Sequence, residues 1–455
     1  MTELTCFKKY DIRGRLGIDL DEEIAHRIGR AFARALSAKT VVLGRDVRTS
    51  SGPLAASVAN ALVDEGCRVL DIGLSGTEEM YFATSHFGAD GGICVTASHN
   101  PLDYNGMKMV RRNSAPLDAD TGLATIKRLA EASDFGPAKA LGTVVDVATA
   151  ARAAYVHRVV SLVDFSAIRP LKVLVNAGHG AAGPTFDAIA NRLALDGVPI
   201  EFVRLFHDPD ETFPQGIPNP LLPENQPPTS AAVLASGADF GVAWDGDFDR
   251  CFFFDHRGQF VEGEYVVGLL AEIFLRKSPG SAIVHDPRVV LNTLDVVSRL
   301  GGRPVQSCTG HAFVKQKMRD EEAVYGGEMS AHHYFKDFFY CDSGMIPWLL
   351  MAELVSSSGA LFDLIERRRA LYPSSGEINF RVDDPQSAML RVRGAFGPHA
   401  RAVDEMDGLS LDMGDWRFNL RGSNTEPVLR LNVEARGDRA LVTKGVQDIS
   451  ALVNG

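Results

Sequence analysis

Asp245, Asp247 and Asp249 stand at alternate positions of one short segment, and we call them the aspartate triplet. In an extended loop this spacing points three carboxylates to the same side of the chain. Such charges repel unless a cation neutralises them, and all-oxygen ligation favours Mg²⁺, Ca²⁺ or Mn²⁺ over zinc. A calcium EF-hand does not fit, because the sixth and twelfth positions are Arg250 and His256 instead of Gly and Glu. An Asp-rich turn that bonds its own backbone is the structural alternative.

Ser98 follows an apolar run at 92–95 and precedes Pro101, without the G-x-S-x-G pattern of the hydrolase nucleophile elbow. A serine hydroxyl can carry a phosphoryl group, and that group beside a divalent cation becomes a phosphoryl donor. The local sequence also fits a serine that caps a helix, since Ser and Asn before Pro often begin helices. His99 and Lys108 follow closely, and either has the chemistry to move the proton of an attacking hydroxyl. A structural histidine and a solvated surface lysine are the alternatives.

In the segment 421–427, Arg421 is followed by small and hydroxyl-bearing residues. Arginine binds phosphate in a bidentate way, and successive backbone N–H groups can form an anion nest. A plain polar turn before a strand is the alternative. Other basic side chains stand at or near expected strand ends, where together they would supply a positive cleft: Arg13, Arg45, Arg48, Arg250, Arg288 and His311. Glu328 and Ser330, in one short polar segment, suit sugar hydroxyls.

The elements that must position these residues recur along the chain. An apolar run, a polar loop and a helical pattern appear three times, with strands expected at 40–43, 172–175 and 282–284 and helices at 54–62, 186–193 and 291–300. Each repeat has a second strand, at 92–95, 240–244 and 323–325. Strands that alternate with helices predict βαβ units and mainly parallel sheets, which bind ligands beyond the carboxyl ends of their strands. After about residue 364 the pattern changes to short strands at 378–382, 416–420 and 428–433 and a helix at 438–453.

These patterns predict an α/β protein with three related α/β/α domains, whose sheets are mixed and mainly parallel, and a smaller C-terminal α+β domain. The predicted boundaries are 1–148 for the domain with Ser98, 149–250 for the aspartate triplet, 251–364 for Glu328 and 365–455 for the phosphate-binding segment at Arg421. Each of the three α/β/α domains would then offer one polar loop to a shared site.

Composition narrows the functional classes. The net charge of −11 argues against a nucleic-acid partner, while 45% hydrophobic and 23% charged residues are ordinary for a globular enzyme. Six scattered cysteines without a C-x-x-C pair favour buried thiols in a reducing cytosol over zinc or disulfides. The first residues lack the apolar core of a signal peptide, and the apolar stretches 265–275 and 345–355 are too short to span a bilayer. We therefore expect a cytoplasmic location without a membrane partner.

Five motifs, in this order along the chain, resemble those of the α-D-phosphohexomutase superfamily, and within it the bacterial phosphomannomutase and phosphoglucomutase group. They are Tyr-Asp-Ile-Arg-Gly at 10–14, Thr-Ala-Ser-His-Asn-Pro at 96–101, Asp-Gly-Asp-Phe-Asp-Arg at 245–250, Gly-Glu-Met-Ser at 327–330 and Arg-Gly-Ser-Asn-Thr at 421–425. The resemblance covers essentially the whole chain.

The resemblance implies that Ser98 is a phosphoserine and that its phosphate and the aspartate triplet hold one Mg²⁺ per chain. It places Lys108, His99 and Arg13 near the reacting hydroxyl, with Lys108 as the first choice for general acid and base. The substrate-binding residues that it implies are Tyr10, Arg250, Arg288, His311, Glu328, Ser330, His332, Arg421, Ser423, Asn424 and Thr425.

The implied reaction passes the phosphoryl group of phosphoserine to a hexose monophosphate. The resulting 1,6-bisphosphate turns round, and its other phosphate returns to Ser98. We expect interconversion of mannose 6-phosphate and mannose 1-phosphate, with hexose 1,6-bisphosphate as activator, by a monomer or weak homodimer. The alternatives are glucose phosphates as the main substrates, a metal-dependent sugar phosphatase, and a non-catalytic sugar-phosphate sensor.

Overall fold

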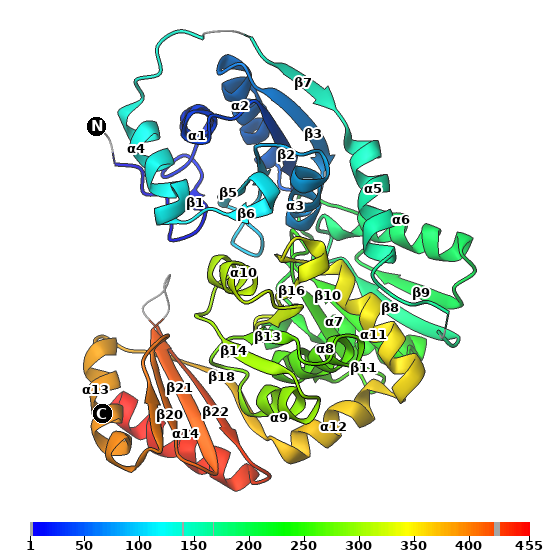
Figure 1. The fold of residues 1–455 in the computed structure, drawn as a ribbon, viewed down its shortest axis with the longest axis vertical. Helices are drawn as coiled ribbons and strands as arrows, with labels where there is room; N and C mark the ends of the chain where they lie inside the picture. Colours follow the sequence, from blue (N-terminus) through cyan, green and yellow to red (C-terminus); the bar gives the residue numbers. More distant parts are fainter. Residues whose placement is uncertain (1–2, 139–140, 167, 423–427) are drawn as a thin grey trace. The chain divides into compact units, whose positions relative to one another are not determined.

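The computed structural model describes residues 3–138, 141–166, 168–422 and 428–455, and its chain divides into two compact units. The first unit comprises Met1–Phe260 and His332–Ser358, and the second comprises Val261–Ala331 and Gly359–Gly455. Figure 1 colours the elements of both units along the sequence.

The first sheet of the first unit has the strand order β1-β5-β4-β2-β3-β7, with β6 paired to β5. Strand β2 is parallel to β3 and β4, and β3 is parallel to β7, whereas β5 runs antiparallel to β1, β4 and β6. The strands are β1 (Ile12–Arg15), β2 (Thr40–Arg45), β3 (Arg68–Leu74), β4 (Gly91–Val95), β5 (Tyr104–Arg111), β6 (Ala115–Pro116) and β7 (Thr143–Asp146). The accompanying helices are α1 (Glu22–Ala35), α2 (Ser51–Asp64), α3 (Thr77–His86) and α4 (Ala124–Ala132).

Helix α1 shows why these segments fold as they do. Asp21 caps its first turn by accepting a hydrogen bond of 2.8 Å from the Ile24 amide. Ile28 and Phe32, four residues apart, share the helix face that is buried in the core of this sheet. Gly29 lets the paired helix α2 approach closely, since a Cβ there would lie 2.7 Å from the Cβ of Ala61.

A second sheet in the first unit has the order β12-β11-β10-β8-β9, with β8 parallel to β9 and β10 and with β11 antiparallel to β10. Its strands are β8 (Leu171–Asn176), β9 (Ile200–Leu205), β10 (Phe240–Trp244), β11 (Cys251–Asp255) and the short β12 (Phe260–Val261). Around it lie α5 (Ala148–Val160), α6 (Ala182–Leu195), α7 (Pro227–Ser236) and the buried α11 (Met345–Ser358), preceded by the antiparallel pair β16 (His333–Phe335) and β17 (Cys341–Asp342). Figure 1 shows α5 and α6 side by side.

In the second unit, β13 lies between β14 and β15 and is parallel to both. These elements are β13 (Ala282–His285), β14 (Arg303–Gln306), β15 (Tyr325–Gly327), α8 (Gly263–Lys277), α9 (Leu291–Arg299), α10 (His311–Asp320) and α12 (Leu361–Leu371).

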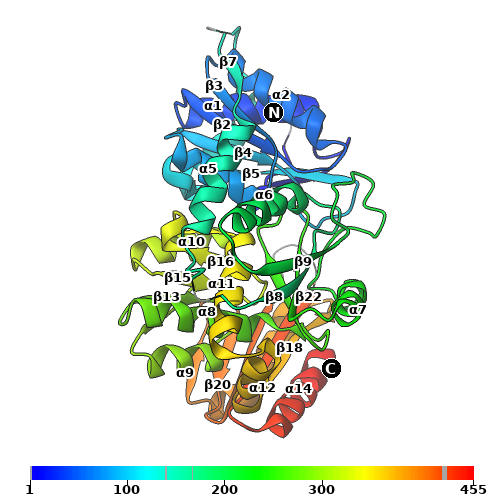
Figure 2. The same ribbon diagram turned by 90° about the vertical axis from the view of Figure 1, so that its right-hand side faces the viewer.

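The second sheet of this unit is antiparallel throughout, in the order β18-β22-β21-β20-β19. Its strands are β18 (Ser374–Arg381), β19 (Ala402–Asp404), β20 (Leu409–Asp412), β21 (Trp416–Gly422) and β22 (Val428–Ala435). Two helices, α13 (Pro385–Phe396) and α14 (Arg439–Asn454), pack against its strands. Figure 2 shows α14 beside this sheet.

The predicted fold class is confirmed, and most predicted elements lie within two residues of the observed ones. Strand β10 has the predicted bounds, whereas β15 begins two residues later than predicted and β18 four residues earlier. Strand β5, which carries Lys108, was not predicted. Its alternation is masked because both of its faces are buried, so its sequence lacks the polar face of an exposed strand.

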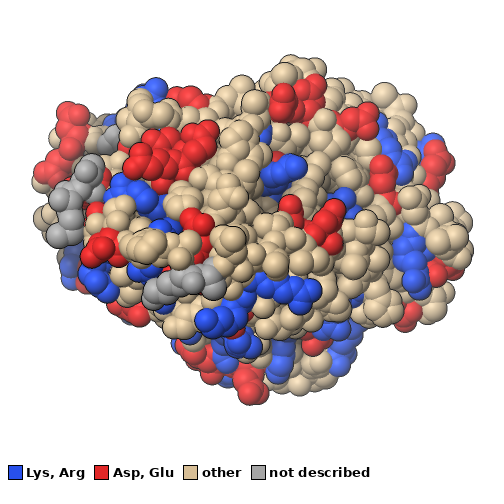
Figure 3. Space-filling view, turned by 90° about the horizontal axis from the view of Figure 1, so that it is seen from above, with Lys and Arg blue, Asp and Glu red and all other residues tan. Residues whose placement is uncertain are grey.

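No single helix among the described residues is long and apolar enough to cross a membrane, and only the bent pair α11 and α12 reaches that length and composition together. On the face seen in Figure 3, acidic and basic side chains are interspersed. All six cysteines are free thiols, and all but Cys308 are buried.

The buried carboxyl of Glu264 should make the stability of the protein depend on pH. Burial, together with the neighbouring charge of Glu262, raises the pKa of Glu264 to about 8. The folded state therefore binds more protons than the unfolded state between about pH 4.5 and 8, so stability falls as pH rises through that window. We expect Glu264→Gln to be more stable than the parent at pH 8.5, by ~2–4 kcal/mol, and to lose most of the pH dependence.

Thermal melts at pH 5.5 and 8.5 measure this effect, with Glu224→Gln, an exposed carboxyl, as the control. Equal pH dependence in Glu264→Gln and the parent would contradict the assignment.

Candidate active site

The aspartate triplet lies in the loop between β10 and β11, where each of its residues is at most 1% exposed. The Oδ2 atom of each carboxylate accepts hydrogen bonds from side chains of other segments. The Oδ1 atoms of Asp245, Asp247 and Asp249 are buried, and none has a hydrogen-bond donor within the described part of the chain. One carboxylate oxygen of each residue lies within 4.8 Å of the others. Three close carboxylates, each with one oxygen that lacks a donor among the described residues, fit an oxygen-preferring divalent cation better than a self-bonded turn.

The charges in this loop are only partly compensated. Burial raises the pKa of Asp245 and raises that of Asp249 well above its usual value. For Asp247 burial acts in the same direction, but the Lys108 ammonium outweighs it and lowers the pKa. The permanently charged partners of the triplet among the described residues are Lys108 and Arg250, fewer than its three carboxylates. The cluster can therefore accept a further positive charge.

Ser98 lies in the loop between β4 and β5, in the left-handed region with φ of +50°. Its amide donates to Thr96 Oγ1 at 2.8 Å, and no helix begins there, so the helix-cap alternative is wrong. We call the segment 245–250, between β10 and β11, the metal loop. Its Gly246 allows Ser98 to approach, because a Cβ at Gly246 would lie 2.5 Å from the Ser98 carbonyl oxygen. The close contact of two backbones brings the serine to the triplet.

The Ser98 hydroxyl is buried and donates to Asp245 Oδ2 at 2.8 Å. Its oxygen also lies 3.0 Å from His99 Nδ1 and 3.3 Å from Arg250 Nη2. Desolvation and the cations Arg250 and Arg13 lower the pKa of His99 well below 6.5. The His99 side chain is 39% exposed, so burial removes only part of its hydration. The charges of the two guanidinium groups account for the rest of the lowering of the pKa. His99 is then neutral near neutral pH and can exchange a proton with its neighbours.

Lys108 is 7% exposed on β5, so the alternative of a solvated surface lysine is wrong. Its ammonium donates to Asp247 Oδ2 at 2.8 Å and to Asp249 Oδ2. Burial would lower the pKa of Lys108, but the three carboxylates of the triplet outweigh it and raise the pKa. The chain thus holds a proton at Nζ beside the candidate cation site.

Arg13 also belongs to this cluster. It lies opposite Gly106 on the neighbouring strand β5, and its guanidinium donates to Asn100 Oδ1 at 2.8 Å and to Asp11 Oδ2 at 2.7 Å. Tyr10, half-buried, stands two residues before β1.

Two further predicted residues contact the triplet. His332 pairs with Arg250 through a backbone bridge and brings Nε2 to 3.7 Å from Asp249 Oδ1. Arg250 itself donates through Nε to Asp245 Oδ2 at 2.9 Å. The first unit therefore brings together Ser98, His99, Lys108, Arg13, Arg250, His332 and the triplet.

Arg48 has a different role from the one its position suggested. Its guanidinium is 3% exposed and donates to the carbonyl oxygens of Ser98, Asn100, Pro101 and Tyr104. It therefore braces the loop that carries Ser98 and is not free to bind an anion. Sequence alone could not reveal this, because a buried arginine that bonds four carbonyl oxygens looks the same in the sequence as a surface one.

In the second unit, Arg288 and Arg421 share one carboxylate, that of Glu377 on β18. Glu377 Oε2 lies 3.3 Å from Arg288 Nη1 and 3.5 Å from Arg421 Nη2, and Oε1 lies 3.6 Å from Arg430 Nη1. Burial and the neighbouring Arg288 cation lower the pKa of Arg421. No signal in the sequence singled out Glu377. Three guanidinium groups around one carboxylate can also hold a phosphate.

Glu328 follows β15, is 1% exposed, and accepts a hydrogen bond of 2.8 Å from the Gly310 amide. Gly310 precedes His311, the first residue of α10, so two residues that were predicted separately, His311 and Glu328, are brought close. Ser330 is half-buried two residues beyond Glu328. The predicted phosphate-binding residues Ser423, Asn424 and Thr425 lie outside the described residues.

The chain matches four domain models of one family. These are the phosphoglucomutase/phosphomannomutase alpha/beta/alpha domains I, II and III at residues 5–136, 153–258 and 262–372, and the C-terminal domain at residues 377–452.

Curated relatives are similar over their full length. A phosphomannomutase of Salmonella montevideo is 57% identical, and one of Escherichia coli K12 is 56% identical, each with 100% of both chains covered. A protein named phosphohexose mutases from Xanthomonas campestris is 55% identical, with 99% of this chain and 100% of that one covered.

Solved structures share the fold. A phosphoglucomutase/phosphomannomutase family protein of Burkholderia thailandensis has a TM-score of 0.88 and 33% identity, with 100% of this chain and 98% of that one covered. The open form of a Paramecium phosphoglucomutase, parafusin, has a TM-score of 0.78 at 16% identity, over 98% and 95% of the two chains, which shows the fold alone.

Three α/β/α domains, an antiparallel C-terminal domain and a buried serine bonded to an aspartate triplet define an isomerase of the phosphohexomutase class. Within that class, the chain belongs to the phosphoglucomutase/phosphomannomutase family. The resemblance found in the five sequence motifs is thus confirmed.

The contact between Gly246 and Ser98 yields a test. Gly246→Ala would push the Ser98 loop away from the metal loop, because the new methyl group would overlap the Ser98 carbonyl oxygen. We expect mutase turnover to fall about 10- to 100-fold while the protein stays folded, since small misplacements of reacting groups cost this much. Steady-state kinetics and a thermal melt measure the two effects.

Gly52→Ala is the matched control, because no atom lies within 4 Å of its Cβ position on α2. Unchanged turnover in Gly246→Ala would show that the close approach of the two loops is not needed.

Proposed function

We propose that this chain is a phosphomannomutase that interconverts mannose 6-phosphate and mannose 1-phosphate through a phosphoserine at Ser98 and a hexose 1,6-bisphosphate intermediate. The observation that carries the proposal is the hydrogen bond from the Ser98 hydroxyl to Asp245, beside three carboxylate oxygens without donors. Three full-length relatives named phosphomannomutase, at 56–58% identity, support mannose phosphates as substrates.

The residues of the first unit carry the proposed transfer. The bond between phosphorus and Ser98 Oγ breaks while a bond from phosphorus to the sugar oxygen forms. We assign the proton transfer to Lys108, which holds a proton on Nζ: that proton passes to Ser98 Oγ as its bond to phosphorus breaks, and the proton of the attacking sugar hydroxyl replaces it on Nζ, so serine and lysine are both regenerated. His99, beside Ser98 Oγ, is the second candidate, and Arg13 is an electrostatic partner.

One Mg²⁺ per chain is the proposed cofactor, held by Asp245, Asp247, Asp249 and the phosphate on Ser98. When bound, Mg²⁺ supplies positive charge that stabilises the transferring phosphoryl group. Hexose 1,6-bisphosphate is the proposed activator, because it returns phosphate to Ser98 after loss of the intermediate. The contacts of Thr77, Lys108, Arg250 and Ser98 with the Oδ2 atoms leave the Oδ1 atoms available.

In the second unit we propose that Arg288 and Arg421 bind the distal phosphate of the sugar. Glu328 suits two adjacent sugar hydroxyls, since a carboxylate accepts two hydrogen bonds in one plane. The other residues proposed to bind substrate are Tyr10, Arg250, His311, Ser330, His332, Ser423, Asn424 and Thr425. We further propose a cytoplasmic monomer or weak homodimer without a nucleic-acid or membrane partner.

Turnover with mannose 1-phosphate tests the proposal directly. With Mg²⁺ and a trace of hexose bisphosphate, we expect mannose 6-phosphate as the product and no accumulation of inorganic phosphate. A stoichiometric release of phosphate would instead identify a phosphatase. Parallel assays with glucose 1-phosphate give the ratio of kcat/KM for the two sugars, which decides whether phosphoglucomutase is the main activity.

Ser98→Ala tests the phosphate carrier. We expect turnover to fall by more than about 1,000-fold, since removal of a covalent nucleophile costs this much, and we expect no phosphoryl adduct in the intact mass after incubation with hexose bisphosphate. Ser133→Ala is the matched control, because Ser133 has the same φ of +50° at an exposed position. A phosphoryl adduct that persists in Ser98→Ala would place the carrier elsewhere.

A further inference from the structure

The start of helix α3 lies directly against the metal loop. The Thr77 amide donates to the Asp247 carbonyl oxygen at 3.2 Å. A Cβ at Gly76 would lie 2.7 Å from that oxygen and 2.4 Å from two ring carbons of Phe248. Only glycine permits this approach without a shift, so the first residue of α3 is held against the backbone of the second metal-loop aspartate.

The Thr77 side chain continues the contact. Its hydroxyl is fully buried and donates to Asp247 Oδ2 at 2.5 Å. The start of α3 thus contacts Asp247 through both a backbone and a side-chain hydrogen bond.

Asp247 Oδ2 also accepts from Lys108 Nζ at 2.8 Å, so one oxygen has two donors while the buried Oδ1 has none among the described residues. The two oxygens of a carboxylate move together, because the group is planar and rigid. Hydrogen bonds from Thr77 and Lys108 to Oδ2 therefore also fix the position of Oδ1. The Lys108 side chain is long and flexible, whereas the Thr77 side chain is short and β-branched, with a restricted χ1. Thr77 is therefore the more rigid of the two supports.

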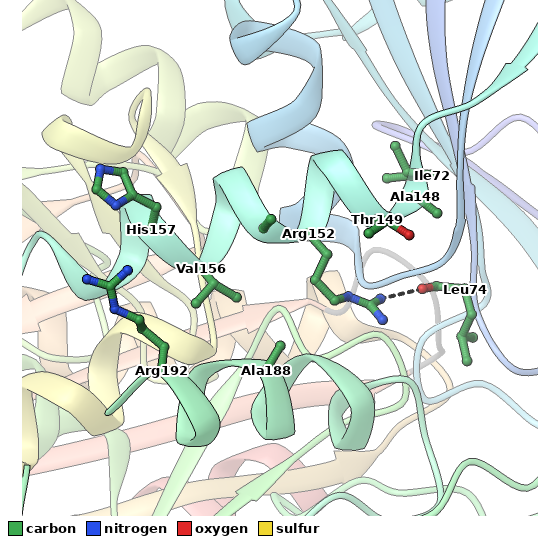
Figure 4. A pocket seen from close by; sticks show the side chains of 10 residues that line it. Ile72, Leu74, Ala148, Thr149, Arg152, Val156, His157, Ala188 and Arg192 are labelled. Carbon is green, nitrogen blue, oxygen red and sulfur yellow. Dashed lines mark hydrogen bonds between the residues drawn. The ribbon is translucent and has the colours of Figure 1, made fainter. Parts of the chain in front are cut away.

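Helix α3 is itself fixed at this end by its next two residues. Glu79 accepts from the Gly76 amide at 3.1 Å, from Arg152 Nε at 3.0 Å and from Thr185 at 3.0 Å. Arg152 in turn donates to the Leu74 carbonyl oxygen at 2.6 Å (Figure 4), beside a cavity of about 570 Å³ between α5 and α6.

Glu78 adds a second anchor, because it accepts from the hydroxyl of the buried Tyr155 on α5. Three consecutive residues of one helix thus bond to three different parts of the unit. The Thr77 hydroxyl cannot move away from Asp247 without breaking contacts at its neighbours.

We propose that Thr77 is a positioning residue for metal binding: its hydroxyl holds Asp247 by Oδ2 so that Oδ1 stays turned toward the bound cation. The inference rests on the proposed metal site, to which it adds a residue that neither binds the cation nor touches the sugar. Loss of a partner that orients a metal ligand in this way typically costs about 10- to 100-fold in metal affinity.

A purely structural threonine makes different predictions. If Thr77 only filled space at the start of α3, an isosteric valine would leave cation affinity unchanged. If the β-branched shape alone mattered, serine would be a poor replacement and valine a good one. The hydroxyl proposal predicts the reverse order for cation binding.

The test measures direct Mn²⁺ binding to the full-length protein by electron paramagnetic resonance, without turnover. We expect Thr77→Val to weaken Mn²⁺ binding about 10- to 100-fold and Thr77→Ser to remain within about threefold of the parent. Thr84→Val is the matched control, because Thr84 is fully buried on the same helix and donates only to Met80. It should bind Mn²⁺ as the parent does.

Kinetics supply an independent readout. In Thr77→Val the Mg²⁺ concentration for half-maximal turnover should rise by the same factor, while the KM for mannose 1-phosphate at saturating Mg²⁺ stays within about threefold. Should Thr77→Val fail to fold in a thermal melt, Thr77→Ala replaces it with the same expected loss and the same serine comparison.

The outcomes separate the two proposals. A parent protein that binds no Mn²⁺ would overturn the metal site itself. A parent that binds Mn²⁺ together with Thr77→Val or Thr77→Ala of equal affinity would overturn the role of Thr77 alone. Equal weakening in Thr77→Ser and Thr77→Val would also overturn it, because the hydroxyl would then not be the cause.

Discussion

The mutual repulsion of Asp245, Asp247 and Asp249 is the constraint around which the first unit is arranged. All three carboxylates are buried, and charges at such depth are stable only when hydrogen-bonded and paired. Lys108 and Arg250 supply two cations, and Ser98 and Thr77 supply hydroxyl donors. Every one of these partners uses an Oδ2 atom, so the neutralisation is incomplete on the side of the Oδ1 atoms. That imbalance gives the loop its capacity for a divalent cation.

The same constraint explains why the neighbouring backbone is so closely packed. The Ser98 carbonyl lies against Gly246, and the metal loop lies against Gly76. At both glycines the contact leaves no space for a side chain. Arg48 then holds the Ser98 loop through four of its carbonyl oxygens, which compensates for the left-handed backbone at Ser98. A rigid frame keeps the serine oxygen within reach of Asp245 without requiring either loop to rearrange.

The second unit gathers guanidinium groups where the first gathers carboxylates. Arg288, Arg421 and Arg430 share the carboxylate of Glu377, and Arg288 also pairs with the buried Asp286. Guanidinium groups that converge in this way can bind phosphate oxygens, just as converging carboxylate oxygens can bind a metal cation.

Local patterns in the sequence were enough to predict the fold class and the types of side chain at the site. Alternation of apolar runs with helical patterns predicted the α/β/α domains because burial periodicity is a local property, and β10 with its aspartate triplet could be located to the residue. Five short motifs were enough to identify the family. Strand β5 escaped detection, since a strand buried on both faces lacks a polar alternation, and Lys108 on it looked like a surface charge.

Only the tertiary structure decided how each side chain is used. Arg48 became a brace, Lys108 a partner of the triplet, and Glu377 the shared acceptor of the second unit, although none of these roles follows from local sequence. Thr77 stands 170 positions from Asp247 in the sequence. The two residues form a hydrogen bond because the first turn of α3 lies against the metal loop. Residue type sets what chemistry is available, but distance and burial set the partners, and both depend on contacts between segments that are remote in the chain.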